Sequence, residues 1–204
     1  MSSARKEILN RLKKAVHEEP EQPDFEAPVY FPIEQPLEIA FKENLEKVNG
    51  SVHLCDSEKA LFTELKKFLQ NYPAESVICN ETGLQDQLLT HSVPFSTASN
   101  LPVTIEVGIT SCEFLIAHTG SVMVSAAMGG GRQLSVYPPI HVVVARKDQL
   151  VDYIGAAYTN IQNKYERRLP SQITMITGPS RTADIEKTLV MGAHGPRELH
   201  VFIA

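Results

Sequence analysis

Residues 177–186 hold, within ten positions, the residue types of an anion-binding turn: Thr-Gly-Pro-Ser-Arg-Thr-Ala-Asp-Ile-Glu. Gly178 ends a predicted strand, and Pro179 suits the first helical position, where its missing N–H removes no hydrogen bond. The unpaired N–H groups of a first helical turn attract anions, and the Arg181 fork matches a carboxylate or phosphate. We therefore predict an anion site here, with an ordinary capped helix as the alternative. The predicted contacts are Gly178, Ser180, Arg181, Thr182 and Asp184.

A second candidate is the glycine-rich stretch that joins two apolar strands. Met128 is followed by three consecutive glycines and then by Arg132. Consecutive glycines carry a high backbone entropy, so they indicate either a flexible loop or close approach of the backbone to another group. We predict that Gly130, Gly131 and Arg132 contact an anion, and a mobile surface hairpin is the alternative.

The stretch between residues 110 and 121 offers further reactive groups. Glu113 is a candidate acid or base, and we place it among the catalytic candidates. Cys112 is a potential nucleophile, but no base is predicted beside it, and lone cysteines are more often core residues. Thr119 and Gly120 lie in a tight turn and are predicted to contribute to anion binding.

Two further histidines have contrasting surroundings. His194 lies in a loop between glycines and a proline, which favours a role in a site, so it is the second catalytic candidate. His141 lies in an apolar strand and is predicted to be a hydrogen-bonded core residue. Neither His194 nor His200 has the spacing of a metal-binding pair, and we predict no metal site.

Composition restricts the classes of protein that could carry these groups. The 204 residues are 43% hydrophobic and 21% charged, with a formal net charge of −5, which is typical of a globular chain and argues against nucleic-acid binding. No stretch of about 20 apolar residues could span a bilayer, and the charged N-terminal stretch does not resemble a secretory signal. The sparse cysteines, Cys55, Cys79 and Cys112, match no metal motif and favour the reducing cytoplasm.

The pattern of apolar residues divides the chain into residues 1–36 and 37–204. The first part is predicted to be an amphipathic helix over residues 3–17, followed by a proline-rich connector over residues 18–36. The second part alternates between helical and strand periodicity, which predicts an α/β domain with a mostly parallel sheet core, flanking helices and a central β-hairpin region. The predicted helices cover residues 37–48, 57–69, 83–89, 149–164 and 179–190. The predicted strands cover residues 51–55, 76–79, 101–108, 114–117, 121–126, 140–145, 173–177 and 199–203, and the last two flank a helix in a βαβ unit.

The order and spacing of several motifs resemble the LUD-domain family, in particular its lactate-utilization (YkgG-like) type. The motifs are Gly-Ile-Thr at 108–110, Ile-Ala-His-Thr-Gly-Ser at 116–121, Arg132, Pro-Pro-Ile-His-Val at 138–142, Gly-Pro-Ser-Arg-Thr-Ala-Asp-Ile-Glu at 178–186 and Gly-Ala-His-Gly-Pro at 192–196. The resemblance covers about residues 37–204. His118 and the pair Cys112-Glu113 stand where many relatives have an acidic residue and Ala-Asp.

The resemblance implies a fold similar to the NagB/RpiA/CoA-transferase group. It also implies a role in bacterial oxidation of L-lactate to pyruvate, together with two partner proteins that carry the iron–sulfur clusters. The chain itself is expected to hold no cofactor, because three cysteines cannot supply the four thiolates of a cluster.

Three functions remain open at this point. In the first, the chain is the non-iron–sulfur subunit of that system: Arg181 and Arg132 hold a small carboxylate, and His194 acts on its hydroxyl group. In the second, the chain is an enzyme by itself, an acyl-CoA transferase with Glu113 or Glu106 as nucleophile or a sugar-phosphate isomerase. In the third, it is a scaffold whose residues 1–36 contact the iron–sulfur partners.

Overall fold

The computed structural model of the chain describes residues 3–15, 22–23, 30–130, 132–183, 189–192 and 194–204, with only the backbone of residues 3, 182–183 and 189–191. The chain divides into two units, Met1–Pro32 and Ile33–Ala204. The first unit contains helix α1 (Ser3–Lys14), which confirms most of the helix predicted over residues 3–17. Its apolar side chains Ile8 and Leu12 are exposed, and Val16 lies outside the described residues.

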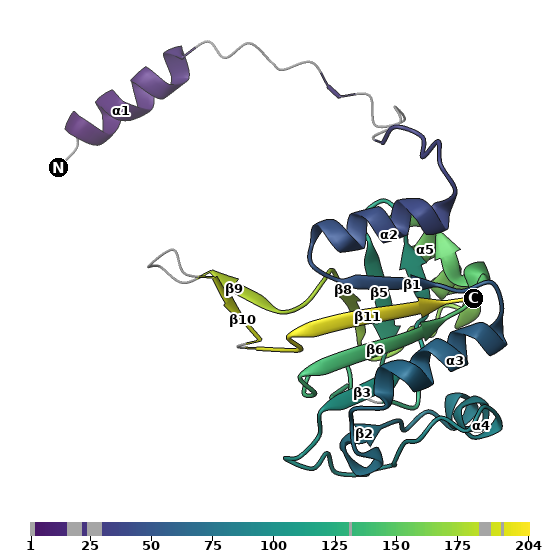
Figure 1. Cartoon of the computed structure of the whole chain (residues 1–204). Helices are drawn as coiled ribbons and strands as arrows, with labels where there is room; N and C mark the ends of the chain where they lie inside the picture. Colours follow the sequence, from purple (N-terminus) through teal and green to yellow (C-terminus); the bar gives the residue numbers. More distant parts are fainter. Residues whose placement is uncertain (1–2, 16–21, 24–29, 131, 184–188, 193) are drawn as a thin grey trace. The chain divides into compact units, whose positions relative to one another are not determined.

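The second unit is built on a five-stranded sheet in which every strand runs parallel to its neighbours (Figure 1). The order across the sheet is β1-β11-β6-β3-β2, so β1 and β2, which are consecutive in the chain, lie at opposite edges. The five strands are β1 (Ser51–Leu54), β2 (Val77–Ile78), β3 (Val107–Thr110), β6 (Ile140–Ala145) and β11 (Glu198–Ile203). The predicted parallel core is therefore confirmed.

A second sheet of four strands carries the predicted hairpin, and its strand order is β7-β4-β5-β8. Strands β4 and β5 pair antiparallel around the turn at residues 118–120, as predicted, and β8 adds antiparallel to β5. Its strands are β4 (Phe114–Ile116), β5 (Ser121–Ser125), β7 (Leu150–Val151) and β8 (Ile173–Ile176).

Helices cover the sheets on separate faces, each through an apolar stripe. The helices are α2 (Leu37–Lys47), α3 (Glu58–Leu69), α4 (Thr82–Thr90) and α5 (Ile154–Lys164), with short 3₁₀ turns at Ala74–Ser76 and Lys147–Gln149. Leu61, Leu65 and Leu69 of α3 and Leu84 and Leu88 of α4 pack in one core on the first face of the parallel sheet. On the opposite face, α2 and the second sheet enclose another core, and α5 covers the far side of the second sheet. Each layer buries an apolar face that would otherwise contact water.

Three predicted elements are wrong in extent or type. Residues 101–106 are not strand, because Ile105 N–H donates to the carbonyl of Pro102 in a turn (3.1 Å) and β3 begins only at Val107. The helix predicted from residue 149 begins at Ile154, because Leu150 and Val151 pair with β4 instead. The helix predicted over residues 179–190 is absent from the described part of that segment, where β9 (Arg181–Ala183) pairs antiparallel with β10 (Leu189–Met191).

Candidate functional site

Three polar residues follow the carboxyl ends of neighbouring parallel strands. Glu81 comes after β2 and immediately precedes α4, Ser111 follows β3, and Arg146 follows β6. Since the carboxyl ends of parallel strands meet at one edge of a sheet, these side chains come together although they lie far apart in the sequence. This edge is where open α/β sheets ordinarily bind ligands.

Glu81 is a buried carboxylate held by one neighbouring residue. Both of its oxygens accept the backbone N–H of Ser111 at 3.1 Å, and Oε2 also accepts the Ser111 hydroxyl at 2.5 Å. Burial raises the pKa of Glu81 more than these hydrogen bonds lower it, and the nearby charge of Glu113 raises it further. A carboxylate with a raised pKa is a stronger base than an exposed one, so Glu81 is suited to accept a proton.

The glycine-rich loop packs directly on this carboxylate. A Cβ on Gly130 would lie 3.1 Å from Oε1 of Glu81, and a Cβ on Gly129 would lie 3.2 Å from its Cα. Side chains at these positions would crowd the carboxylate or its backbone. Close backbone approach, one of the two alternatives for this loop, is therefore what the structure has at Gly129 and Gly130; Gly131 lies outside the described residues.

Glu113, which follows the carboxyl end of β3, lies at the centre of a second polar cluster. Its carboxylate is enclosed and accepts three hydrogen bonds, from Ser125 Oγ (2.5 Å), Lys164 Nζ (2.6 Å) and Tyr165 Oη (2.7 Å). Burial alone would raise the pKa of Glu113, but the bonds from Lys164, Ser125 and Tyr165 outweigh it and leave the pKa lowered. The opposite applies to Lys164, whose pKa is raised because its bond to Glu113 outweighs its partial burial. Lys164 is therefore a fixed cation.

A cavity of about 530 Å³ is lined by residues of both polar clusters. Its polar lining includes Glu81, Gln87, Ser111, Arg146, Gln149 and Lys164. Arg146 is paired with Asp148 at 3.0 Å, and Lys164 is paired with Glu113 at 2.6 Å while its side chain remains half exposed. A cation, a buried base and a hydroxyl group in one cavity suit a small acid that also carries a hydroxyl group.

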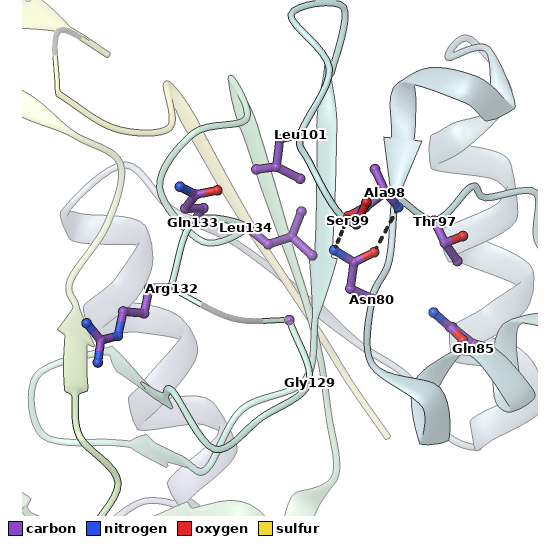
Figure 2. Close-up of a pocket in the computed structure, with 11 residues that line it drawn as sticks. Asn80, Gln85, Thr97, Ala98, Ser99, Leu101, Gly129, Arg132, Gln133 and Leu134 are labelled. Atoms are coloured by element: carbon purple, nitrogen blue, oxygen red, sulfur yellow. Dashed lines mark hydrogen bonds between the residues drawn. The ribbon is translucent and has the colours of Figure 1, made fainter.

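A larger cavity of about 770 Å³ lies on the other side of the glycine loop, since Gly129 lines both cavities. Figure 2 shows Asn80, Gln85, Leu101 and Leu134 around it. The side-chain amide of Asn80 bonds to both the N–H (3.1 Å) and the carbonyl (2.9 Å) of Ala98, which fixes the segment that forms one wall.

The anion site predicted on residues 178–184 lacks its physical basis in the described residues 178–183, because Arg181–Ala183 form strand β9 and not the first turn of a helix. Gly178 has a φ of +80° and turns the chain, and the backbone of Ser180 bonds to Pro196 (2.8 Å) and Gly192 (2.9 Å). These bonds tie the segment into a hairpin, which explains why pairing prevails over the helical pattern. Arg181 is exposed, and Asp184 lies outside the described residues, as does the side chain of Thr182.

The two predicted catalytic residues lie near opposite ends of the parallel strands. His194 is exposed and precedes the amino end of β11, whereas Glu113 follows the carboxyl end of β3, which runs parallel to β11 through β6. Figure 1 shows β9 and β10 beyond the amino ends of β6 and β11. The structure therefore does not bring His194 to Glu113.

Arg132, predicted to contact an anion, donates a hydrogen bond to Ser171 Oγ at 2.7 Å.

Thr119 and Gly120 serve the packing of the hairpin turn. Gly120 has a φ of +61°, and a Cβ there would overlap the backbone nitrogen of Leu45 in α2. The Thr119 hydroxyl bonds to that of Ser121 at 2.7 Å, which in turn bonds to Thr177. Close contact with α2 accounts for the glycine without a ligand.

The buried histidine and cysteines behave mostly as predicted. His141 is fully buried and its Nε2 lies 2.9 Å from Thr110 Oγ1, but its Nδ1 has no hydrogen-bond partner among the described residues. Burial lowers the pKa of His141 to about 4, so it stays neutral. Cys112 is a buried free thiol whose pKa is raised by burial, as expected for a core residue and not for a nucleophile.

The comparison with protein families bears on this geometry. The model of the LUD domain matches residues 39–204, which cover both sheets and both cavities. The chain belongs to the LUD-domain family. The resemblance inferred from the sequence motifs is therefore confirmed.

Several LUD-domain relatives carry names that refer to lactate. The chain is 36% identical over 149 residues to lactate utilization protein C of Shouchella clausii, which is 67% of this chain and 65% of that protein. It is 30% identical to lactate utilization protein C 1 of Bacillus mycoides over 76% of this chain and 67% of that protein. It is 34% identical to the uncharacterized protein YkgG of Escherichia coli over 45% of this chain and 40% of that protein. The chain thus spans about two fifths to two thirds of the length of these relatives.

A solved structure supports the fold. A DUF162 family protein from Deinococcus radiodurans is similar with a TM-score of 0.60 and 21% identity, over 82% of this chain and 95% of that one. The described residues contain no helix long and apolar enough to cross a membrane. They also contain no group of three His, Cys, Asp or Glu side chains placed to hold a metal ion.

The sequence interpretation of this LUD domain missed four lining residues: Glu81, Arg146, Gln149 and Lys164. Ser111 stood beside a predicted candidate but was not selected. One available signal was position, because Arg146 comes one residue and Glu81 two residues after a predicted strand of a parallel sheet. No local pattern marks Lys164, whose role depends on contact with Glu113, 51 residues earlier.

Proposed function

We propose that this LUD-domain chain is a subunit of a bacterial L-lactate-utilisation system and that its 530 Å³ cavity binds the 2-hydroxy acid. The names of the relatives support lactate as the pathway. The observation that carries the site is the joint presence of Glu81, Ser111 and Lys164 on one cavity. The other buried carboxylate among the described residues, Glu113, is already saturated by three donors.

Each group has a distinct part in this proposal. Lys164 attracts the carboxylate of the acid, and Glu113, buried behind it, positions the ammonium group. Glu81 accepts a hydrogen bond from the acid's hydroxyl group and then its proton. Oxidation of the hydroxy acid to a keto acid removes two protons and two electrons, and the electrons pass to an acceptor held by iron–sulfur partners. Glu113 itself is saturated by three donors, which favours this positioning role over that of a nucleophile.

Calorimetric titration with L-lactate and with propionate, which lacks the hydroxyl group, tests the proposal. In Glu81→Gln, lactate is expected to bind roughly tenfold or more weakly while propionate is unaffected, because a hydrogen bond to a charged group contributes about 1.5–3 kcal/mol. In Lys164→Met, both acids are expected to bind more weakly, because the lost charge serves the carboxylate they share.

The matched control is Lys66→Met, which removes an exposed lysine on α3 that lines neither cavity. It is expected to bind both acids as the wild type does. Absence of lactate binding to the wild type, or equal lactate affinity in Glu81→Gln, would contradict the proposed site.

The proposed assembly with iron–sulfur partners has its own candidate surface on α1. Ile8, Leu9 and Leu12 are 60%, 46% and 62% exposed, an unusual density of apolar side chains on a 12-residue helix. Deleting residues 1–32 is expected to abolish co-purification with the iron–sulfur proteins of the same pathway while leaving the stability of the LUD domain unchanged. The triple variant Ile8→Ser/Leu9→Ser/Leu12→Ser should reproduce the loss, and full retention of the partners in both variants argues against this surface.

A further inference from the structure

Two histidines from distant parts of the chain meet on the parallel sheet. His53 lies in β1 and His200 in the adjacent strand β11, and the register of this parallel pair places both side chains on the same face of the sheet. The Nε2 of His53 lies 3.5 Å from the Nδ1 of His200. Because 147 residues separate the two histidines, no local spacing in the sequence indicates the pair.

The separation of these two nitrogens is close to the one that a single metal ion requires. Zinc binds imidazole nitrogens at about 2.0–2.1 Å in a tetrahedral arrangement, so two such nitrogens on one ion lie about 3.3–3.4 Å apart. A small rotation of the two rings from their present distance of 3.5 Å therefore admits one ion. Burial and the neighbouring His200 lower the pKa of His53, so its ring is neutral at pH 7, as a metal ligand must be.

A carboxylate orients the second histidine from its far side. The Nε2 of His200 lies 3.0 Å from Oε2 of Glu198. A neutral ring that donates its Nε2–H to this carboxylate keeps Nδ1 unprotonated, and this nitrogen is the one that faces His53. Carboxylates in this position fix the tautomer of metal-binding histidines and raise their basicity.

Aromatic side chains support both rings. The His53 ring stacks on Phe202 with the ring centroids 4.1 Å apart and an angle of 6° between the planes. The ring of Phe68, from α3, packs against His200 with the centroids 4.5 Å apart. These contacts restrict the rings, so little freedom is lost when an ion binds between them.

A cavity of about 340 Å³ reaches this pair from the side of α3. Its lining includes His53, Glu64 and Lys67, and the last two are paired at 4.0 Å. The nearby charge of Glu64 favours a cation at His53, since it acts to raise the pKa of that ring. Water can enter through the cavity and occupy coordination positions that the histidines leave open.

We propose that His53 and His200 bind one divalent transition-metal ion, with Zn²⁺ as the ion that fits best, and that water fills the remaining positions. The described residues offer no group of three His, Cys, Asp or Glu side chains placed as ligands, so this site is weaker than a structural zinc site with four protein ligands. The ion joins the edge strand β1 to β11, the last strand of the chain. Its binding therefore stabilises the pairing of the two ends of the domain.

Calorimetric titration of the full, untagged chain with Zn²⁺ tests the site. The wild type is expected to bind one ion saturably. His53→Gln and His200→Gln are each expected to weaken binding roughly tenfold or more, because each removes one of two protein ligands. Glu198→Gln leaves both ligands in place and is expected to weaken binding about tenfold. The control is His91→Gln, which removes another partly buried histidine that faces a glutamate and is expected to bind Zn²⁺ as the wild type does.

Two further measurements separate loss of the site from loss of folding. The urea midpoint without metal shows whether each variant is folded, and added Zn²⁺ is expected to raise it in the wild type but not in His53→Gln. Co²⁺ is expected to give the visible absorption bands of a tetrahedral site in the wild type and not in His200→Gln. Glu198 is exposed, so its variant decides the question if a ligand variant does not fold.

Absence of saturable Zn²⁺ binding to the wild type overturns the metal site and leaves the two histidines as a hydrogen-bonded pair. Equal Zn²⁺ affinity in the wild type, the two ligand variants and His91→Gln overturns it as well, because the ion then binds elsewhere. Weaker binding in both ligand variants and in Glu198→Gln, with unchanged binding in His91→Gln, supports it.

Discussion

Replacement of Gly120 with alanine is expected to destabilise the domain by about 3–5 kcal/mol, enough to leave much of a marginal protein unfolded. Two costs combine at this position. The φ of +61° costs a non-glycine residue roughly 1–2 kcal/mol, and the added Cβ overlaps the backbone nitrogen of Leu45, which no side-chain rotation can relieve. The urea midpoint of unfolding, at an unchanged slope, measures the effect.

Gly83→Ala is the matched control for this substitution. Gly83 lies in the first turn of α4, and a Cβ there meets nothing within 4 Å. Alanine is a better helix former than glycine by about 0.5–1 kcal/mol, so this variant is expected to be slightly more stable than the wild type. A loss of stability in Gly120→Ala no larger than about 1 kcal/mol would show that α2 can move away from the turn.

Lys164→Met is expected to cost about 2–4 kcal/mol of stability at pH 7, the second large effect. The substitution leaves the Glu113 carboxylate buried with only two neutral donors, Ser125 and Tyr165. Breaking a buried pair by removing one partner is costly, and the half-exposed position of Lys164 places this case in the lower part of the usual range. Lys66→Met on α3 is again the control and is expected to change stability by less than about 0.5 kcal/mol.

The pH dependence of unfolding gives this prediction a second readout. In the wild type the pKa of Glu113 is lowered in the folded state, so its stabilisation is present above the unfolded pKa and disappears as the pH falls through the folded pKa. Without Lys164, burial dominates and the pKa of Glu113 rises above its unfolded value, so the charged carboxylate destabilises the variant at neutral pH and this loss is expected to shrink as the pH falls. Identical acid limbs in variant and wild type would mean that Lys164 does not set the protonation of Glu113.

The fold was largely predictable because the spacing of apolar residues within a segment indicates its type and its buried face. The stripe Leu61, Leu65 and Leu69 predicts a helix with one buried face, and α3 has that face buried. The turn at Gly120 and the parallel core follow from similar local signals. The last βαβ unit was wrong because residues 179–190 combine a helix-starting proline with residues able to form strands, and the pairing of β9 with β10 decides between them.

The site was much less predictable, because its residues depend on contacts between distant segments. In the sequence, nothing distinguishes Glu81 from a surface glutamate. Its hydrogen bonds from Ser111, 30 residues later, and the glycine loop that covers it are visible only in the structure. Glu113 was chosen as a candidate acid or base from its residue type, but its saturation by three donors appears only in the folded chain. Arg132 and Arg181 were selected for anion binding because a charged residue near glycines can be recognised in the sequence. Whether a charged side chain is buried cannot be recognised there.

The position of β11 between β1 and β6 imposes an order on biogenesis. The ribosome makes β1 early, yet its hydrogen-bonding neighbour in the sheet comes from β11, and 147 residues separate His53 from His200 on these two strands. At about 5–20 residues per second, β1 waits roughly 7–30 s for that neighbour. During translation the nascent chain therefore carries β1 as an unpaired strand until β11 has been made.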